Sequence, residues 1–257
     1  MDLIADHISH CFGALEVLDD VSFTVRAGEV VAIVGPSGCG KSTLLSILGG
    51  LLQSSAGQAE LRGAPPAGSL NPLTFVFQDF ALLPWSTVEA NVEFPLLHTP
   101  LSAAECRAQV DDALRRTGLT DFRATYPKQL SGGMRQRVGI ARALAVRPAI
   151  LLMDEPLSAL DSQTRELLME DFIRLLADGA MGAVYVTHNL EEAVRLADRI
   201  VVLSRRPGRV REVVTMPMTR SERGSAEWRG KLLAVQNDLW SLIRNEAIDA
   251  EREVQDA

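Results

Sequence analysis

The first residues along the chain whose types and spacing could do chemistry form a glycine-rich loop. Residues 35–42 read Gly-Pro-Ser-Gly-Cys-Gly-Lys-Ser and fit the pattern G-x-x-x-x-G-K-S at every fixed position. The loop follows the continuous apolar run 30–34, which predicts a buried strand, and opens the segment 41–51, which has helical character. Backbone N–H groups at a helix N-terminus point at phosphate oxygens, and glycine lets the backbone wrap closely. The pattern predicts a phosphate-binding loop rather than a turn that binds nothing.

Two side chains of this loop have a defined chemical task. Lys41 is expected to reach the β- and γ-phosphates of a nucleotide, and the Ser42 hydroxyl is expected to ligate Mg²⁺. The remaining contacts are expected from the loop as a whole. The predicted nucleotide-binding residues here are Gly35, Pro36, Ser37, Gly38, Cys39, Gly40, Lys41, Ser42 and Thr43.

Cys39 lies inside the loop, and the simplest interpretation is a small residue that fits there. A helix N-terminus and a nearby lysine both lower the pKa of a thiol. We therefore expect the thiol to react with alkylating reagents and the product to block nucleotide binding.

A second chemical feature is the apolar run 150–153 that ends in two carboxylates, Asp154 and Glu155. Asp154, at the end of a strand, can hold Mg²⁺ through its water shell. Glu155 is the natural general base for an attacking water. Alone, the pair could equally be an acidic turn after an ordinary strand, but beside a phosphate loop it becomes specific.

Two more polar residues follow predicted strands. His188 comes after the run 184–187 and can contact a γ-phosphate and help to position the water, although a lone histidine there is more often structural. Gln78 follows the run 75–77 and can bind Mg²⁺ or the water, although a lone glutamine is usually a surface residue.

Composition narrows the class of protein. The 257 residues are 47% hydrophobic and carry a net charge of -7, which suits a folded globule and argues mildly against a nucleic-acid partner. Three scattered cysteines give no disulfide framework or zinc spacing, so a reducing cytosolic compartment is expected. The first residues do not resemble a secretory signal, and no run approaches the roughly 18 apolar residues of a membrane span. If the protein works at a membrane, a partner must hold it there.

Strands and helices are expected to alternate along the chain. Residues 1–30 are predicted to form short strands, with 17–25 alternating around an acidic turn, and 57–77 are predicted to form two more strands. Buried strands are expected at 149–153, 182–186 and 199–203. Helices are expected from 88 to 119 with a capping box at 102–105, after Ser131, and at about 162–177 and 189–197. This alternation predicts an α/β fold with helices on both faces of a parallel sheet.

Residues 130–137, Leu-Ser-Gly-Gly-Met-Arg-Gln-Arg, resemble the signature motif of ABC-transporter ATPase subunits. The order of the other motifs matches that family too, and the resemblance spans about residues 3–215. It implies a P-loop ABC ATPase with a RecA-like parallel-sheet core, a small antiparallel sheet from 1–30 and 57–77, and a helical subdomain inserted at about 88–145. The ATPase domain would cover 1–220, and 221–257 would form a helical tail.

The resemblance also implies how ATP is bound. Ser131, Gly132 and Gly133 begin a helix, which makes a second anion-binding N-terminus, and in this family it contacts the γ-phosphate of ATP held by the opposite subunit. Because the chain has one of each motif, it is expected to pair head-to-tail with a second copy around two ATP molecules. Asp161 belongs to the segment 158–161, which matches the family's D-loop. Phe12 is the candidate for stacking on adenine, and a core phenylalanine is the alternative.

The segment 80–88 is expected to receive a helix of a membrane subunit, because in this family it lines the docking groove. Leu82, Leu83 and Trp85 could instead be core residues. The sequence Leu-Leu-Pro-Trp followed by Thr-Val-x-x-Asn-Val, together with residues 204–210, resembles the corresponding segments of the nitrate, sulfonate and taurine importer subfamily. This implies integral-membrane permease subunits, a solute-binding protein and a peripheral location on the cytoplasmic face of the plasma membrane. The sequence does not identify the solute, because the ATPase never touches it.

Two other functions are open to a chain with this loop. A soluble ABC ATPase that acts as a scaffold is one, but DNA-repair relatives carry long coiled-coil insertions for which there is no room here. A small-molecule kinase is the other, but it does not explain the motif at 131–133.

Overall fold

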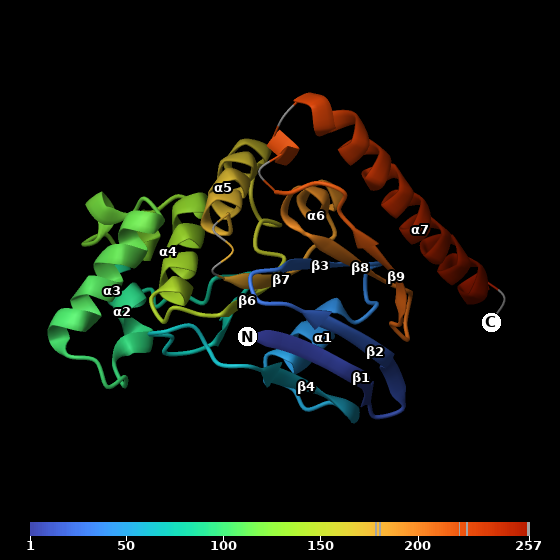
Figure 1. Cartoon of the computed structure of the whole chain (residues 1–257), viewed down its shortest axis with the longest axis horizontal. Coiled ribbons are helices and arrows are strands. Elements are labelled where there is room, and N and C mark those ends of the chain that lie inside the picture. Colours follow the sequence, from blue (N-terminus) through green and yellow to red (C-terminus); the bar gives the residue numbers. More distant parts are fainter. Residues whose placement is uncertain (178, 180, 221, 225, 256–257) are drawn as a thin grey trace.

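The computed structural model describes residues 1–177, 179, 181–220, 222–224 and 226–255. Its strands form two sheets, one of three strands in the order β2-β1-β4 and one of six in the order β5-β6-β7-β3-β8-β9. Helices cover the six-stranded sheet and form a separate group beside it (Figure 1). The predicted α/β class is therefore confirmed.

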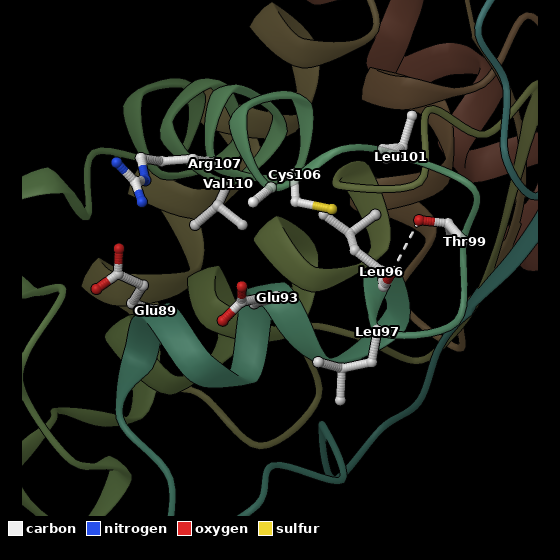
Figure 2. A pocket seen from close by; sticks show the side chains of 10 residues that line it. Glu89, Glu93, Leu96, Leu97, Thr99, Leu101, Cys106, Arg107 and Val110 are labelled. Carbon is white, nitrogen blue, oxygen red and sulfur yellow. Dashed lines mark hydrogen bonds between the residues drawn. The ribbon is translucent and has the colours of Figure 1, made fainter.

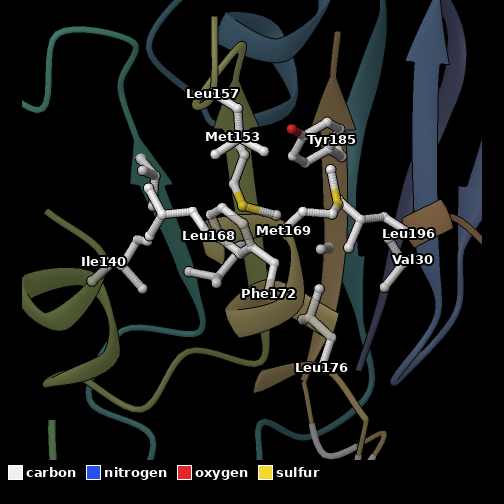
Figure 3. Packing of buried hydrophobic residues seen from close by; sticks show 14 of the residues in the cluster. Val30, Ile140, Met153, Leu157, Leu168, Met169, Phe172, Leu176, Tyr185 and Leu196 are labelled. Carbon is white, nitrogen blue, oxygen red and sulfur yellow. The ribbon is translucent and has the colours of Figure 1, made fainter. Parts of the chain in front are cut away.

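The six-stranded sheet is the core of the molecule. Five neighbouring strands pair in parallel, and only the edge strand β9 runs antiparallel. Every residue of β3 and β7 is buried, which explains their unbroken apolar sequences, because helices or the smaller sheet cover both faces. Figure 3 shows one of these layers, where Phe172 and Met169 of a covering helix pack against Met153 and Tyr185 of the sheet. The strands are β3 (Val30–Val34), β5 (Leu73–Val76), β6 (Ile150–Asp154), β7 (Gly182–Val186), β8 (Arg199–Leu203) and β9 (Val210–Thr215).

The small sheet is antiparallel and contains β1 (Asp2–Phe12), β2 (Leu15–Val25) and β4 (Ala56–Arg62). Two details differ from expectation. The acidic stretch at 19–20 does not form a turn that ends the strand. Strand β2 continues through it with an irregular register, and Asp20 has a φ of 52°. The other expected strand of 57–77, β5, does not join this sheet but pairs in parallel with β6 in the core.

The helices begin and end at recognisable caps. The predicted box at Ser102 is present, with its side chain and that of Glu105 each accepting from the other's backbone N–H. Helix α4 starts directly after Ser131, as expected. The helices are α1 (Lys41–Leu48), α2 (Val88–Glu93), α3 (Ala103–Arg116), α4 (Gly132–Leu144), α5 (Ser162–Leu175), α6 (Leu190–Leu196) and α7 (Arg229–Gln255). Short 3₁₀ turns are η1 (Phe94–Leu96), η2 (Thr120–Phe122), η3 (Pro127–Gln129), η4 (Glu222–Gly224) and η5 (Ala226–Trp228).

Helices α2, α3 and α4 pack on one another and form a lobe beside the core sheet (Figure 1). The chain enters the lobe after β5 and returns to the sheet at β6, so the lobe is inserted between two neighbouring core strands. This matches the expected helical subdomain. The domain boundary at residue 220 remains a prediction.

The tail forms α7, which packs against α6 and runs along the outside of the molecule (Figure 1). Leu239 of this helix is fully buried in the core, and Leu232, Val235, Leu242 and Ile243 pack against it, while Leu233 is 57% exposed. Residues 256–257 of the predicted tail lie outside the described residues.

We expect Leu239→Ala to lower the free energy of unfolding by about 2–5 kcal/mol, because it leaves a cavity where α7 meets the core. Leu233→Ala is the matched control and should change it by about 0.5 kcal/mol or less. Denaturant unfolding followed by tryptophan fluorescence measures both. Equal losses in the two variants would contradict this docking of α7.

Candidate active site

The predicted phosphate loop connects the end of β3 to the start of α1. Gly38 and Gly40 have φ of 75° and 102°, a region of backbone conformation that favours glycine. A Cβ at Gly40 would also lie 2.7 Å from Leu18 Cδ2 and 3.1 Å from the Val17 carbonyl oxygen, so these neighbours would have to shift. The glycines at these two positions therefore allow the chain to curl and then enter the helix. The first N–H groups of α1 have no partner within the helix and are available to an anion.

Lys41 lies inside the curl of this loop. Its ammonium donates to the carbonyl oxygens of Gly35, at 2.9 Å, and Pro36, at 2.8 Å. The side chain is buried, so the loop holds a positive charge at its centre. A polyphosphate cradled by the loop would meet this charge together with the dipole of α1.

Ser42 and Asp154 meet across the site. The Ser42 hydroxyl donates to Asp154 Oδ1 at 3.1 Å. Burial raises the pKa of the Asp154 carboxyl, and the neighbouring charge of Glu155 acts in the same direction, while Ser42 and Lys41 oppose them. Two oxygen ligands, one of them a carboxylate whose negative charge is poorly solvated, are the donor set that fits Mg²⁺.

Glu155 and His188 form the next pair. Glu155 Oε2 lies 3.1 Å from His188 Nδ1. The two residues follow the adjacent strands β6 and β7, and the Glu155 N–H donates to the Val186 carbonyl at 3.0 Å, which ties the ends of those strands together. His188 is exposed and Glu155 is partly buried, so both side chains can be reached from solvent.

Gln78 has a partner that sequence reasoning did not anticipate. Its amide donates to the Ser158 hydroxyl at 3.2 Å, and that hydroxyl donates to the Glu155 carbonyl at 2.9 Å. Gln78 therefore lies close to the Asp154–Glu155 turn, although it comes from a different strand end. The sequence signal for Ser158 was its place in the 158–161 segment.

Ser131 and Asp161 both cap helices. The Ser131 hydroxyl accepts from the Met134 N–H at 3.2 Å at the start of α4. Asp161 accepts from the N–H groups of Gln163 and Thr164 at the start of α5, which lowers the pKa of its carboxyl. Each residue has a local structural task besides the predicted contact with nucleotide.

The two glycines of the 131–133 motif have different surroundings. A Cβ at Gly133 would lie 2.5 Å from Thr164 Cγ2, so this glycine is required where α4 packs closely on α5. A Cβ at Gly132 would have only an ordinary contact, 3.5 Å from Leu160 Cδ2. Gly132 is partly exposed and Gly133 is buried, which leaves Gly132 and Ser131 as the accessible part of the motif.

Phe12 is 52% exposed at the end of β1, with its ring edge-on to His10. The alternative that it is a core phenylalanine is therefore wrong, and stacking on adenine stays a prediction. Trp85 is 74% exposed, so it is not a core residue either. Leu82 and Leu83 are half-buried.

An apolar groove lies beside Gln78, between the core sheet and the helical lobe. Phe75 and Phe77 stack on one another in it, and the side chains of Leu51 and Phe94 border it from two other elements and are at least half exposed. The groove encloses about 420 Å³. The sequence prediction of an exposed apolar surface was limited to residues 80–88 and missed these four.

A second pocket lies within the helical lobe, between α2–η1 and α3 (Figure 2). Leu96 and Val110 form its apolar part, and Glu89 and Glu93 lie on one side. Leu97 and Thr99 also line it, and the Thr99 hydroxyl donates to the Leu96 carbonyl at 2.8 Å. No predicted nucleotide-site residue lines this pocket, so it is separate from the site described above.

The lowered pKa expected for Cys39 is wrong, whereas the block of nucleotide binding by alkylation stays a prediction. Its side chain is 1% exposed and packs beneath the loop, where a Cβ on Gly35 would lie 2.9 Å from the sulfur. Burial raises the pKa of the Cys39 thiol, and this effect exceeds the opposing effect of the Lys41 charge. Proximity to a helix start and a lysine was visible in the sequence, but burial was not.

At neutral pH we expect iodoacetamide to label Cys39 far more slowly than Cys11, which is exposed. Because the pKa of Cys39 is raised, its labelling should continue to accelerate with pH above the range where an ordinary thiol is fully ionised. Mass spectrometry of time courses on single-cysteine variants measures both rates. Labelling of Cys39 as fast as Cys11 at neutral pH would contradict the buried placement.

Comparison with known proteins agrees with this geometry. The family model described as ABC transporter matches residues 18–158, more than half of the chain. A taurine import ATP-binding protein of Burkholderia pseudomallei is 46% identical over 77% of this chain and 76% of its own length. An aliphatic sulfonates import ATP-binding protein of Xanthomonas axonopodis is 43% identical over 81% of this chain and 83% of its own length.

A solved structure of similar fold is a dimeric ATP-binding cassette in a post-hydrolysis state, bound to ADP and Pi. It is 33% identical, covers 84% of this chain and all of its own, and superposes with a TM-score of 0.71. Motif order, fold and relatives agree, and the chain belongs to the ABC transporter family as one of its ATP-hydrolysing cassette subunits.

Proposed function

We propose that this chain energises an importer for small anionic or organic solutes of the nitrate, sulfonate or taurine type. The observation that carries the ATP-hydrolysing part of this proposal is that three functional groups meet at the carboxyl ends of the parallel strands. These are the loop charge on Lys41, the Ser42–Asp154 pair and the Glu155–His188 pair. The type of solute rests on the named relatives, which are taurine and sulfonate import proteins.

ATP is the substrate, and the chain's own groups bind it. Backbone N–H groups of residues 37–43 surround the phosphates, and the Lys41 ammonium exchanges its loop carbonyls for the β- and γ-phosphate oxygens. Phe12, exposed at the end of β1, offers its ring face to the adenine.

Ser42, Asp154 and Gln78 would hold Mg²⁺, with Ser42 as a direct ligand and Asp154 acting through water. When bound, the ion neutralises the charge that develops on the phosphate oxygens. The raised pKa of Asp154 fits this role, because a cation would restore the stability of its charged form.

Hydrolysis requires a group that accepts a proton from the attacking water. Glu155 accepts it as the water oxygen bonds to the γ-phosphorus and the bond to the ADP oxygen breaks. His188, 3.1 Å from the Glu155 carboxylate, holds that carboxylate and contacts the γ-phosphate from the other side. Gln78 orients the water or the ion from its place beside Ser158.

The partner in this reaction is a second copy of the chain. The α4 N-terminus, with Ser131 and Gly132 accessible, completes the phosphate site of the opposite subunit, and Asp161 supports the same interface. The dimeric form of the similar cassette supports this arrangement. Two ATP molecules are then held between head-to-tail copies, and ATP binding closes the dimer.

The apolar groove is the proposed dock for integral-membrane permease subunits. Phe77, Phe94 and Leu51 border it, and Trp85 is exposed on the segment that follows Gln78. Among the described residues no helix is both long and apolar enough to cross a membrane. We place the chain as a peripheral subunit on the cytoplasmic face of the inner membrane, coupled indirectly to a solute-binding protein and not to nucleic acid.

We expect Glu155→Gln to keep ATP binding, to trap an ATP-bound dimer and to slow hydrolysis by about 100-fold or more, because the proton acceptor is lost. Size-exclusion chromatography with ATP and a phosphate-release assay measure the two effects. Glu166→Gln, an exposed carboxylate on α5, is the control and should hydrolyse ATP normally. A normal rate in Glu155→Gln would remove Glu155 from the role of base.

The alternative, a soluble ABC ATPase that assembles or scaffolds other proteins, predicts no membrane partner. We expect the tagged chain to co-purify with an integral membrane protein from its native membrane, and Phe94→Asp to reduce that recovery several-fold while leaving basal ATP hydrolysis intact. Leu233→Asp changes an equally exposed leucine on α7 and should have no effect. Recovery from the cytosol alone would favour the soluble alternative.

A further inference from the structure

One buried carboxylate near the proposed site has no part in the chemistry above. Glu192 is the third residue of α6 and is only 4% exposed. Helix α6 starts at Leu190, two residues after His188, and Asn189 caps it by accepting from the N–H groups of Glu191 and Glu192. The Glu192 side chain turns inward from the first turn of this helix. A buried carboxylate is costly unless its oxygens are paired, so its partners indicate what it does.

One oxygen of Glu192 holds the end of β7. Glu192 Oε2 accepts from the Tyr185 hydroxyl at 2.8 Å and from the Thr187 hydroxyl at 2.7 Å. Burial, and then the charge of Glu192, raise the pKa of Tyr185 well above its ordinary value, so this hydroxyl remains a donor. Thr187 directly precedes His188, and its hydroxyl also accepts from the Asn189 N–H at 3.0 Å. The backbone on both sides of His188 is therefore fixed through Thr187.

The other oxygen of Glu192 faces α5. Its Oε1 lies 3.8 Å from Arg165 Nε, on the first turn of that helix. Arg165 in turn donates to the carbonyl oxygens of Leu160, at 2.8 Å, and Leu157, at 3.4 Å. These carbonyls belong to the turn that carries Ser158, the residue linking Gln78 to Glu155. Figure 3 shows Leu157 and the Tyr185 hydroxyl at the same end of the packed layer.

We propose that Glu192 and Arg165 are positioning residues, which set the 157–161 turn against the end of β7. The pair thereby keeps Glu155 and His188 at hydrogen-bond distance and Ser158 beside Gln78. This inference rests on the proposed function, because positioning Glu155, His188 and Gln78 matters only if these groups take part in ATP hydrolysis. Neither residue touches ATP. The expected consequence of breaking the pair is slower hydrolysis with unchanged ATP affinity, since the hydrogen bonds and ion pairs that these two residues make with the described residues do not include the phosphate loop.

A neighbouring ion pair separates positioning from simple helix packing. Arg195 of α6 and Glu166 of α5 form a two-pronged ion pair with distances of 2.6 and 2.8 Å. This pair joins the same two helices with shorter contacts than Arg165 and Glu192, but neither residue donates to the 157–161 turn or to Thr187 among the contacts of the described residues. It is therefore the matched control.

The test compares single and double variants of the full-length protein in steady-state ATP hydrolysis and in equilibrium binding of a fluorescent ATP analogue. We expect Glu192→Gln and Arg165→Met each to lower kcat by about 10-fold or more, with the dissociation constant of the nucleotide within about two-fold of the parent. The double variant should be no slower than the slower single variant, because the two residues act as a unit. Glu166→Gln and Arg195→Met should keep kcat within about two-fold.

Three results would overturn the proposal. They are full kcat in both Glu192→Gln and Arg165→Met, an equal loss of kcat in the Glu166 and Arg195 controls, and a loss of nucleotide affinity that matches the loss of kcat. If the Glu192 variant does not fold, Thr187→Val gives the same readout. It removes one hydroxyl from the carboxylate and should lower kcat alone, whereas Thr187→Ser should retain it.

Failure of the proposed function looks different. If the parent protein hydrolyses no ATP, or Glu155→Gln hydrolyses it normally, the assignment of the hydrolytic groups fails and the positioning proposal fails with it. If Glu155→Gln is inactive while the Glu192 and Arg165 variants are fully active, only the positioning proposal is overturned.

Discussion

Parallel pairing of β6, β7 and β3 is the constraint on which the rest of the structure depends. Neighbouring parallel strands bring their carboxyl ends to one edge of a sheet, where ligands of such folds bind. Here β3 leads into the phosphate loop, β6 into Asp154 and Glu155, and β7 into His188. The pairing extends beyond the strands, because the Glu155 N–H donates to Val186 and the Thr187 N–H donates to Ile33. A slip of one residue would turn these side chains to the opposite face and separate Glu155 from His188.

The sequence was most informative where a feature depends on neighbouring residues. The loop at 35–42, the cap at Ser131 and the box at Ser102 were all predictable, because each is a short pattern with its own hydrogen bonds. Features set by distant packing were not. The place of β5 in the core follows from its pairing with β6, and the raised pKa of Cys39 follows from burial beneath Gly35. Propensity and spacing carry no information about either contact.

Two charged groups of the site have partners within the chain that a phosphate and a cation could replace. The positive charge of Lys41 lies inside the loop on two carbonyl oxygens, whose hydrogen bonds are weaker than those of phosphate oxygens. The charged form of Asp154 is disfavoured by burial and by Glu155, so a cation beside Ser42 would relieve it. Under the proposed function, a magnesium nucleotide would satisfy both groups at once, whereas the ion or the polyphosphate alone would leave one of these charges without its best partner.

The backbone at Glu155 shows how the fold holds a proposed catalytic group in place. Its φ of 44° is in the left-handed region, which costs a residue with a side chain about 1–2 kcal/mol. Contacts on both sides offset this cost, since its N–H donates to Val186 and its carbonyl accepts from the Ser158 hydroxyl. If β6 continued regularly, the Glu155 side chain would point to the sheet face opposite that of Asp154. The left-handed turn instead directs the carboxylate toward His188, and the 157–161 turn that supports it is the one that Arg165 and Glu192 hold. The backbone conformation of Glu155, the proposed base, therefore depends on its hydrogen bonds with Val186 and Ser158 and on the turn to which Arg165 donates.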